Sequence, residues 1–305
     1  MWHVLTGVVV ARGRGFSVSA VTCDGEHASW TRPEASVGHR LVLVNRGRFR
    51  RRVTGAAATV DPTVGYLGLP GEQESFAHPA GGDRCTSVAI APDLWRLLAG
   101  DPARPERTAV YVDARLELAH RRVLAAATSG DLDHALAQEL LALVASAIRR
   151  TVAGPTPARA PDTTRAKARD AALAAAAREA IAADHPAAGG LFPLAELLGV
   201  SPYRLSRGFS RELGISLTHY RNRVRVSRAL ERLAAGERNL GVLAADLGFS
   251  DQPHLTRTIQ THLGHTPAVL RRLLQTRSDF ATMARAMPDR RERRSTDRAA
   301  GSSPE

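Results

Sequence analysis

The sequence predicts an α+β protein in which an N-terminal β-barrel or sandwich with a helical extension precedes a linker and an all-α domain. Three observations support this prediction. From Val8 to about Trp95, short β-branched and apolar runs alternate with Gly, Pro and Asp breaks, as in a sandwich or barrel. From Arg169 to Leu274, apolar residues follow a helical period. A Pro-rich stretch without periodicity separates the two regions.

Composition and charge restrict the classes of function. The chain has 305 residues, enough for two domains with separate cores, and 44% of its residues are hydrophobic. No run approaches the roughly 18 apolar residues of a spanning helix, and the N-terminus lacks the basic residues and cleavage site of a signal peptide. We therefore expect a cytoplasmic protein without a membrane partner. A net charge of +12 favours polyanionic partners, although a membrane surface or a merely basic protein also fits it.

The N-terminal region, residues 1–100, consists of predicted strands. The string HRLVLVNRGRFRRRV predicts a strand-turn-strand hairpin, and its three consecutive arginines, residues 50–52, suit either a solvated strand end or an anionic effector. Residues 101–150 form the helical extension, with two or three helices that start near Ala109 and break near residues 129–131. These helices either brace the barrel or form the seam of a homodimer.

Two further segments delimit the C-terminal domain. Residues 151–168 are rich in Pro and small side chains and predict a linker. The helical domain spans residues 169–275. The tail, residues 288–305, has almost no apolar side chain to bury and is predicted to be disordered.

The string LFPLAELLGVSPYRLSRGFSRELGIS predicts a helix-turn-helix motif. Gly199 follows a short leucine-rich helix where a left-handed cap is needed, and Ser201 and Pro202 start the next helix. That helix buries one apolar side and ends at Gly214. Its opposite face offers side chains to base edges in a major groove. These are Tyr203, Arg204, Ser206, Arg207 and Arg211.

A second helix-turn-helix motif is predicted by the string NLGVLAADLGFSDQPHLTRTIQTHLGHTP. It repeats the order of short helix, glycine, apolar turn residue, cap and second helix. Gly248 caps a short helix, Phe249 packs in the turn, and either Ser250 or Asp251 caps the following helix. The outward residues of that helix are Gln252, His254 and Arg257.

One long amphipathic helix is predicted between the two motifs, in the string SLTHYRNRVRVSRALERLAAGE. Its apolar side serves a core shared by both motifs. Four arginines are expected on its remaining surface, where some contact phosphates without reading sequence. These are Arg221, Arg223, Arg225 and Arg228.

The strings SPYRLSRGFSRELGIS and ADLGFSDQPHLTRTIQTHLGHTPAVLRR resemble the DNA-binding domain of the AraC/XylS family of bacterial transcription regulators. The resemblance implies that Tyr203, Ser206 and Arg207 occupy base-reading positions of the first recognition helix, and that Gln252, His254 and Arg257 occupy those of the second. The sequence departs from the family where Gly208 replaces a bulkier residue and where Ile259-Gln260 replaces a common Phe-Lys pair. The second change removes a phosphate contact, so we expect the first motif to dominate DNA affinity.

The N-terminal region resembles the cupin-like sensor domain of many family members, most clearly in GYLGLPGEQESFAHPAGGDRCTSVAI. Metal-binding cupins carry a His-x-His cluster with a downstream Glu and a further His, whereas His39 and His78 stand alone here. We therefore expect no metal, no cofactor and no catalytic residue. A looser set of His39, His78, Cys23 and Cys85 suits zinc, but its spacing does not demand a site.

The sequence thus predicts a transcription regulator, not an enzyme, with a small-molecule effector acting on the N-terminal domain. Its partners are double-stranded promoter DNA, a second copy of the chain if the helices form a seam, and RNA polymerase if the protein activates. A DNA-repair methyltransferase with the same DNA-binding module is the alternative enzyme, but it needs a cysteine cluster and only two isolated cysteines are present. A third alternative is an architectural protein that binds DNA without sequence preference.

Overall fold

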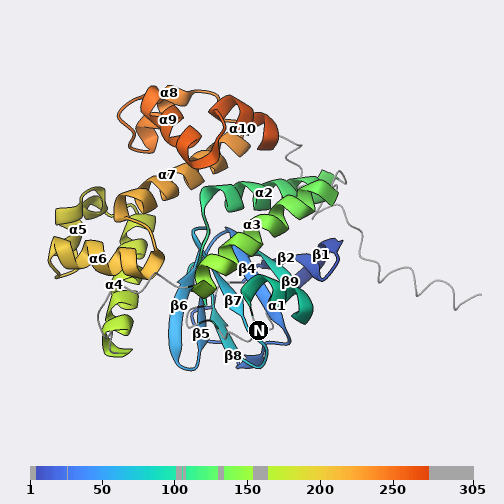
Figure 1. Cartoon of the computed structure of the whole chain (residues 1–305). Helices are drawn as coiled ribbons and strands as arrows, with labels where there is room; N and C mark the ends of the chain where they lie inside the picture. The colour runs from blue at the N-terminus through green and yellow to red at the C-terminus, as the bar shows by residue number, and fades with distance from the viewer. Residues whose placement is uncertain are drawn as a thin grey trace, which may run out of the picture.

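The structure is a computed structural model that describes residues 5–25, 27–100, 105, 108–129, 134–153 and 164–274. A β-rich domain with covering helices is followed by a helical domain (Figure 1). The tail expected at residues 288–305 and most of the expected linker lie outside the described residues. Within the described ranges, no helix is long and apolar enough to cross a membrane.

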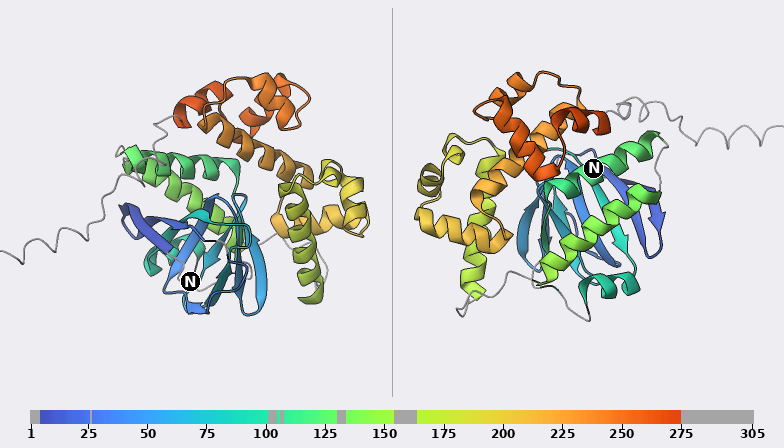
Figure 2. Two further views of the ribbon diagram at one scale, coloured as in Figure 1. Left: turned by 180° about the vertical axis from the view of Figure 1, so that it is seen from behind. Right: turned by 45° about the horizontal axis from the view of Figure 1, so that its top comes forward.

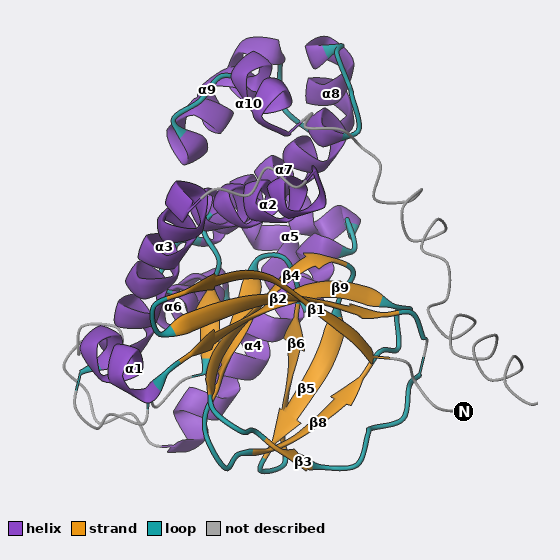
Figure 3. Cartoon of the chain, turned by 90° about the vertical axis from the view of Figure 1, so that its right-hand side faces the viewer, coloured by secondary structure: helices purple, strands orange, loops and turns teal. Residues whose placement is uncertain are grey.

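The β-rich domain consists of two antiparallel sheets. The larger sheet has the strand order β1-β2-β9-β4-β7-β10, with bounds Leu5–Gly13, Phe16–Cys23, Asp83–Ile90, His39–Arg46, Val64–Gly68 and Ala109–Tyr111. The smaller has the order β3-β8-β5-β6, with bounds Glu34–Ala35, Gln73–Ala77, Phe49–Val53 and Ala56–Val60. Figure 3 shows both sheets curving around a common interior. This architecture confirms the β-rich N-terminal domain.

Alternation along β4 divides the side chains between two cores. Leu41 and Leu43 face the helices that cover the larger sheet, whereas Val42 and Val44 point between the sheets, where they pack with Phe49. Successive side chains of a strand point to opposite faces, so the uninterrupted apolar run of β4 is buried on both sides.

The predicted hairpin between β4 and β5 is wrong. These strands belong to different sheets: β4 pairs with β7 and β9, whereas β5 pairs with β6 and β8. The chain crosses between the sheets at Gly47, whose φ is 80° and where a Cβ would lie 2.7 Å from the carbonyl oxygen of Gly82. Only glycine fits both requirements.

Helices α1 (Pro92–Ala99), α2 (Ala114–Ser129) and α3 (His134–Ala153) cover the outer face of the larger sheet. Leu116, Leu140 and Val144 contribute to the same core as the strands, as expected for helices that brace the barrel. The predicted helical start near Ala109 is wrong, because residues 109–111 form β10 and pair with β7. The break near residues 129–131 falls between the bounds of α2 and α3.

The C-terminal domain contains seven described α-helices. They are α4 (Thr164–Ala182), α5 (Leu191–Leu197), α6 (Pro202–Leu213), α7 (Leu217–Ala234), α8 (Leu240–Asp246), α9 (Gln252–Leu263) and α10 (Pro267–Leu274). Figure 2 shows two helical groups joined by the long helix α7. Tyr220 and Val224 of α7 pack with α4–α6, and Leu230 and Leu233 pack with α8–α10. This confirms the expected linker helix, but the expected shared core is wrong: the two halves of α7 belong to two separate cores, one for each motif.

The two domains also share a core. In Figure 1, α7 crosses next to α2, and α2 contacts α7, α9 and α10. Ala114 and Leu118 of α2 pack in the same buried cluster as Leu255 and Ile259 of α9. The second helix-turn-helix motif is therefore docked on the helical extension of the first domain, which the sequence analysis did not predict.

Candidate nucleic-acid interface

Local signals position the first recognition helix, α6. The hydroxyl of Ser201 accepts a hydrogen bond from the backbone N–H of Arg204 at 3.2 Å, and Pro202 occupies the first turn. Gly199 and Gly214 have φ values of 63° and 73° and end the short helix and α6. These glycines adopt the left-handed conformation that the sequence pattern predicted at both sites.

On the outward side of α6, the aromatic ring of Tyr203 contacts the guanidinium group of Arg207. Tyr203 is 70% exposed, and Arg204 and Arg207 are also exposed. Arg207 Nη1 donates to Tyr203 Oη at 2.9 Å, and its guanidinium lies 5.5 Å from the centroid of the Tyr203 ring. This contact restricts the Arg207 side chain, which lowers the conformational entropy that binding of any partner by this side chain would cost. Ser206 lies half-buried on the same helix.

Arg211 lies at the other end of α6 and contacts another helix. Its guanidinium pairs with the carboxylate of Asp170 in α4 at 3.2 Å. Gly208 permits this close approach, because a Cβ there would lie 3.0 Å from Asp170 Oδ1 and 3.4 Å from Leu173 Cδ2. The departure from the family at Gly208 therefore has a packing reason, and Arg211 fixes α6 to α4.

The second recognition helix, α9, begins at Asp251. The Asp251 carboxylate accepts a hydrogen bond from the backbone N–H of His254 at 2.6 Å, which decides between the two predicted caps. Gln252 and Arg257 are exposed. His254 is half-buried, with Nδ1 3.1 Å from the Ser250 hydroxyl, so it contacts the turn as well as the outer surface.

The arginines of α7 do not share one environment. Arg223 is 0% exposed, so its predicted place on the surface is wrong. Its Nη1 pairs with Glu117 of α2 at 2.7 Å, and its Nε donates to the carbonyl of Val112 at 2.9 Å. Arg228 pairs with Asp184. The helical period places Arg223 among polar positions, but α2 covers that side of α7.

Glu117 is the acceptor at the centre of this contact between domains. Ser227 Oγ donates to it at 2.8 Å, and Arg121 pairs with it at 2.7 Å. Burial disfavours the charged carboxylate, but Arg223 and Arg121 outweigh burial and lower the pKa of Glu117 to about 2. The carboxylate therefore stays ionised inside the interface.

A second polar contact joins the smaller sheet to the first helix-turn-helix motif. Arg178 of α4 pairs with Asp61 at 2.5 Å. The hydroxyls of Thr63 and Tyr220 lie 2.8 Å apart. Burial opposes the charge on Arg178, but Asp61 more than compensates and raises the pKa of that guanidinium. Sequence reasoning found none of these pairs, because more than a hundred residues separate the partners of each.

All three arginines of the run at residues 50–52 lie over an aromatic ring, and Arg51, which lies over Tyr66, is also buried. Arg51 bonds to Glu74 through Nε at 2.8 Å and to Glu72 through Nη2 at 2.9 Å. Arg50 and Arg52 lie over the Trp30 ring. The predicted solvated strand end is therefore wrong for Arg51, which joins strands inside the smaller sheet.

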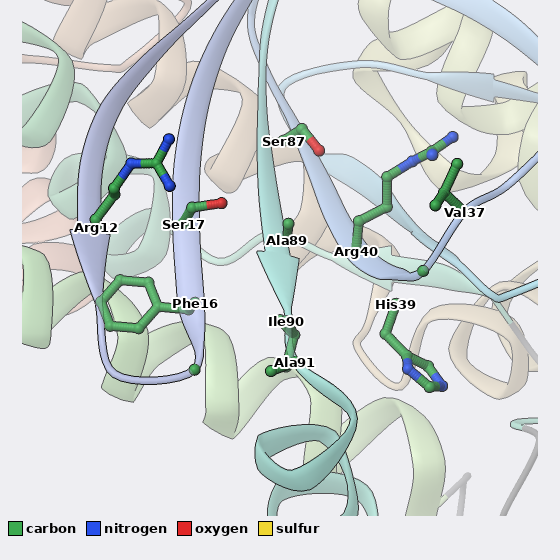
Figure 4. A pocket seen from close by; sticks show the side chains of 12 residues that line it. Arg12, Phe16, Ser17, Val37, His39, Arg40, Ser87, Ala89, Ile90 and Ala91 are labelled. Carbon is green, nitrogen blue, oxygen red and sulfur yellow. The ribbon is translucent and has the colours of Figure 1, made fainter.

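A hollow of about 510 Å³ lies on strands β1, β2, β4 and β9 (Figure 4). Its polar lining includes Arg12, Ser17, Arg40 and Ser87. The strand register aligns Arg12, Ser17 and Arg40 on one face of the sheet. Arg40 also pairs with Glu74. The volume is in the range of small-molecule sites.

The looser set of histidines and cysteines separates in the structure. His39 stacks on Trp95 with ring centroids 4.4 Å apart, away from the others. Cys23 and His78 come together with His27, a residue that the sequence analysis did not single out. Cys85 lies near Asp83, and burial raises its pKa well above the usual value.

Two capped recognition helices on one linker helix, beside a β-sheet domain, define a DNA-binding protein of the double helix-turn-helix class. Residues 194–273 match the family described as helix-turn-helix domain. The match assigns a helix-turn-helix domain to this part of the chain, which contains both helix-turn-helix motifs.

Three known proteins are similar to the C-terminal part. The bifunctional transcriptional activator/DNA repair enzyme AdaA of Bacillus subtilis is 31% identical over 80 residues, which are 26% of this chain and 38% of that protein. The C-terminal domain of AraT, a response regulator from Geobacillus stearothermophilus, is 31% identical over 33% of this chain and 84% of that one, with a TM-score of 0.31. An AraC-type regulator from Chromobacterium violaceum is 25% identical over 35% of this chain and 96% of that one, with a TM-score of 0.33.

Proposed function

We propose that the chain binds a defined promoter sequence by placing α6 and α9 in successive major grooves, about 34 Å apart on one side of the duplex. The observation that carries this proposal is the pair of capped helices with exposed Arg207 and Arg257 on equivalent outer positions. Arg bonds to guanine through two nitrogens and so reads the base. The residues proposed to contact DNA are Tyr203, Arg204, Ser206, Arg207, Arg211, Gln252, His254 and Arg257.

Replacing each key arginine tests the groove assignment. Arg207→Ala and Arg257→Ala are each expected to weaken operator binding by about 1–3 kcal/mol and to relax base preference. Because Arg207 is ordered by Tyr203 and the second motif lacks a phosphate contact, Arg207→Ala should cost more. Affinity is measured by fluorescence anisotropy on a footprinted operator and on single-base variants of it.

Arg272→Ala is the matched control, since it removes one exposed positive charge of α10 outside both recognition helices. It should weaken binding to all sequences equally. Wild-type affinity in both recognition variants would overturn the assignment, and equal affinity of the parent protein for every sequence would favour an architectural role instead.

We further propose that an effector acting on the N-terminal domain controls DNA binding through the buried contact between domains. The support is the docking of α2 against α7 and α9, with Glu117 and Arg223 ionised at its centre. The hollow lined by Arg12 and Arg40 is the place where a small acidic effector would bind. Breaking the contact and measuring operator affinity tests this control.

A repair activity, which the name of AdaA assigns to that protein, has less support here. The chain spans 38% of AdaA, in the helix-turn-helix region. Burial raises the pKa of Cys23 and of Cys85. A protonated thiol is a poor nucleophile, so neither side chain is set up by itself to accept an alkyl group.

A further inference from the structure

Three side chains from separate segments converge in the β-rich domain. Cys23 ends β2, His27 follows in the connection to β3, and His78 follows β8. The Sγ of Cys23 and one nitrogen of each imidazole all lie within 4.8 Å of one another. Cys23 is 3% exposed and His78 is 6% exposed. The three side chains therefore form a compact donor cluster away from bulk solvent.

The outer nitrogens of both imidazoles face acceptors. His27 Nδ1 lies 3.0 Å from the carbonyl oxygen of Ser29, and His78 Nε2 lies 2.7 Å from Asp83 Oδ1. An acceptor at one ring nitrogen favours the tautomer that carries its proton there. In those tautomers, the inner nitrogen of each ring carries a lone pair that a cation can bind.

Those two inner nitrogens, His27 Nε2 and His78 Nδ1, lie 2.7 Å apart. Two lone pairs at this distance repel unless a proton or a cation lies between them. A cation satisfies both nitrogens and keeps both outer N–H groups on their acceptors. The arrangement matches the carboxylate-histidine-metal and carbonyl-histidine-metal pattern that orients ligands in metal sites.

The donor set selects among cations. One thiolate and two imidazoles suit Zn²⁺, whereas Mg²⁺ and Ca²⁺ prefer oxygen ligands. Zinc bonds of about 2.0–2.3 Å in a tetrahedron require ligand atoms about 3.3–3.6 Å apart. The donor atoms lie within 4.8 Å of one another, and the two nitrogens, now 2.7 Å apart, must move apart when both bind the ion.

We propose that Cys23, His27 and His78 bind one zinc ion, with Asp83 and the Ser29 carbonyl orienting the imidazoles. The fourth position is open to water. Binding displaces the thiol proton of Cys23 into solvent and forms a Zn–S bond, while both imidazoles bind as neutral ligands. The ion joins β2, the segment after it and the end of β8, where His27 and His78 already exchange two backbone hydrogen bonds. The site stands independently of DNA recognition.

Metal binding to the full-length protein tests the site. Protein stripped with a chelator and dialysed is titrated with Zn²⁺ and with Co²⁺, and bound metal is measured by mass spectrometry of the elements. We expect one metal ion per chain and, with Co²⁺, a near-ultraviolet sulfur-to-cobalt absorption. Cys23→Ser should remove that absorption. Cys85→Ser, which changes the other cysteine, should retain it.

Histidine variants keep the test decisive if Cys23→Ser does not fold. His27→Gln should abolish stoichiometric binding, whereas His39→Gln, at a histidine of the same domain outside the cluster, should not. Asp83→Asn should weaken zinc binding by about 10–100-fold through loss of orientation. Circular dichroism confirms folding of each variant. A folded parent protein that binds no zinc, or equal loss in Cys23→Ser and Cys85→Ser, would overturn the proposal, and neither result would alter the expected operator binding.

Discussion

At the scale of the residue, one buried and one half-buried histidine contribute to the response of the protein to acid. His120 is 1% exposed, with Nε2 2.6 Å from the Thr86 hydroxyl. Burial, assisted by Arg121, lowers the pKa of His120 to about 4. Burial also lowers the pKa of His262 to about 4, assisted by His219, whose ring centroid lies 4.7 Å away. Both imidazoles are therefore neutral in the folded protein at neutral pH.

The unfolded chain binds these protons more readily, with an ordinary histidine pKa of about 6.5. Stability is therefore present above about pH 6.5 and is lost as the pH falls toward 4. For His120 alone, the free energy of unfolding should fall by about 2 kcal/mol between about pH 7 and pH 5. Urea titrations at the two pH values measure this change.

His120→Gln should reduce the loss, because glutamine retains a donor for Thr86 but does not titrate. His265→Gln, at an exposed histidine, is the control and should keep the full loss. The ionised Glu117 adds its own loss only below its unfolded pKa of about 4.5, so the two effects occupy different pH ranges. An unchanged unfolding free energy from pH 7 to 5 would contradict the burial argument.

At the scale of the element, capping residues determine where the recognition helices begin and end. Ser201 and Asp251 each accept a hydrogen bond from the backbone N–H three residues later. Gly214 and Gly264 end α6 and α9 with φ values of 73° in both. The sequence pattern is repeated because the unpaired backbone N–H and C=O groups at the ends of both helices need similar capping residues.

The caps allow a matched comparison in α9. Asp251→Ala removes the acceptor for the His254 N–H and should lower stability by about 1 kcal/mol. Ser250→Ala should cost less, because the Ser250 hydroxyl contacts the His254 ring and caps no backbone N–H. Thermal unfolding of both variants measures the difference. Equal destabilisation would show that the cap is not at Asp251.

At the scale of the whole molecule, a buried ionic contact joins the β-rich domain to the helical domain. Glu117→Gln leaves Arg223 charged and buried with a neutral partner, and breaking such a pair costs about 3–5 kcal/mol. We expect the domains to separate, with a larger radius of gyration in solution scattering and a changed operator affinity. Glu139→Gln is the control, since Glu139 pairs with Arg122 at the surface, where a pair is worth about 0–1 kcal/mol. Parent-like scattering and affinity in Glu117→Gln would show that the contact does not couple the domains.

The sequence by itself determined the local part of the molecule. Hydrophobic period, Gly, Pro and caps predicted the β-rich domain, the linker helix and both recognition helices, because each signal acts over a few residues. The same local rules predicted wrong results where distant segments meet. The hairpin at β4 and β5 fails because β4 pairs with β7 and β9, whereas β5 pairs with β6 and β8 in the other sheet. Arg223 was expected at the surface because the sequence pattern of α7 alone does not indicate that α2 packs over this residue.

Only the tertiary structure decided the contact between domains and the cluster of Cys23, His27 and His78. The partners of Arg223 lie in another domain, and His27 and His78 are brought together by an isolated bridge between β-segments. The spacing of residues along the chain does not predict these long-range contacts, because they depend on how whole sheets and helices pack together. Both helix-turn-helix motifs could thus be predicted from the sequence, whereas the contact between the two domains became evident only from the fold.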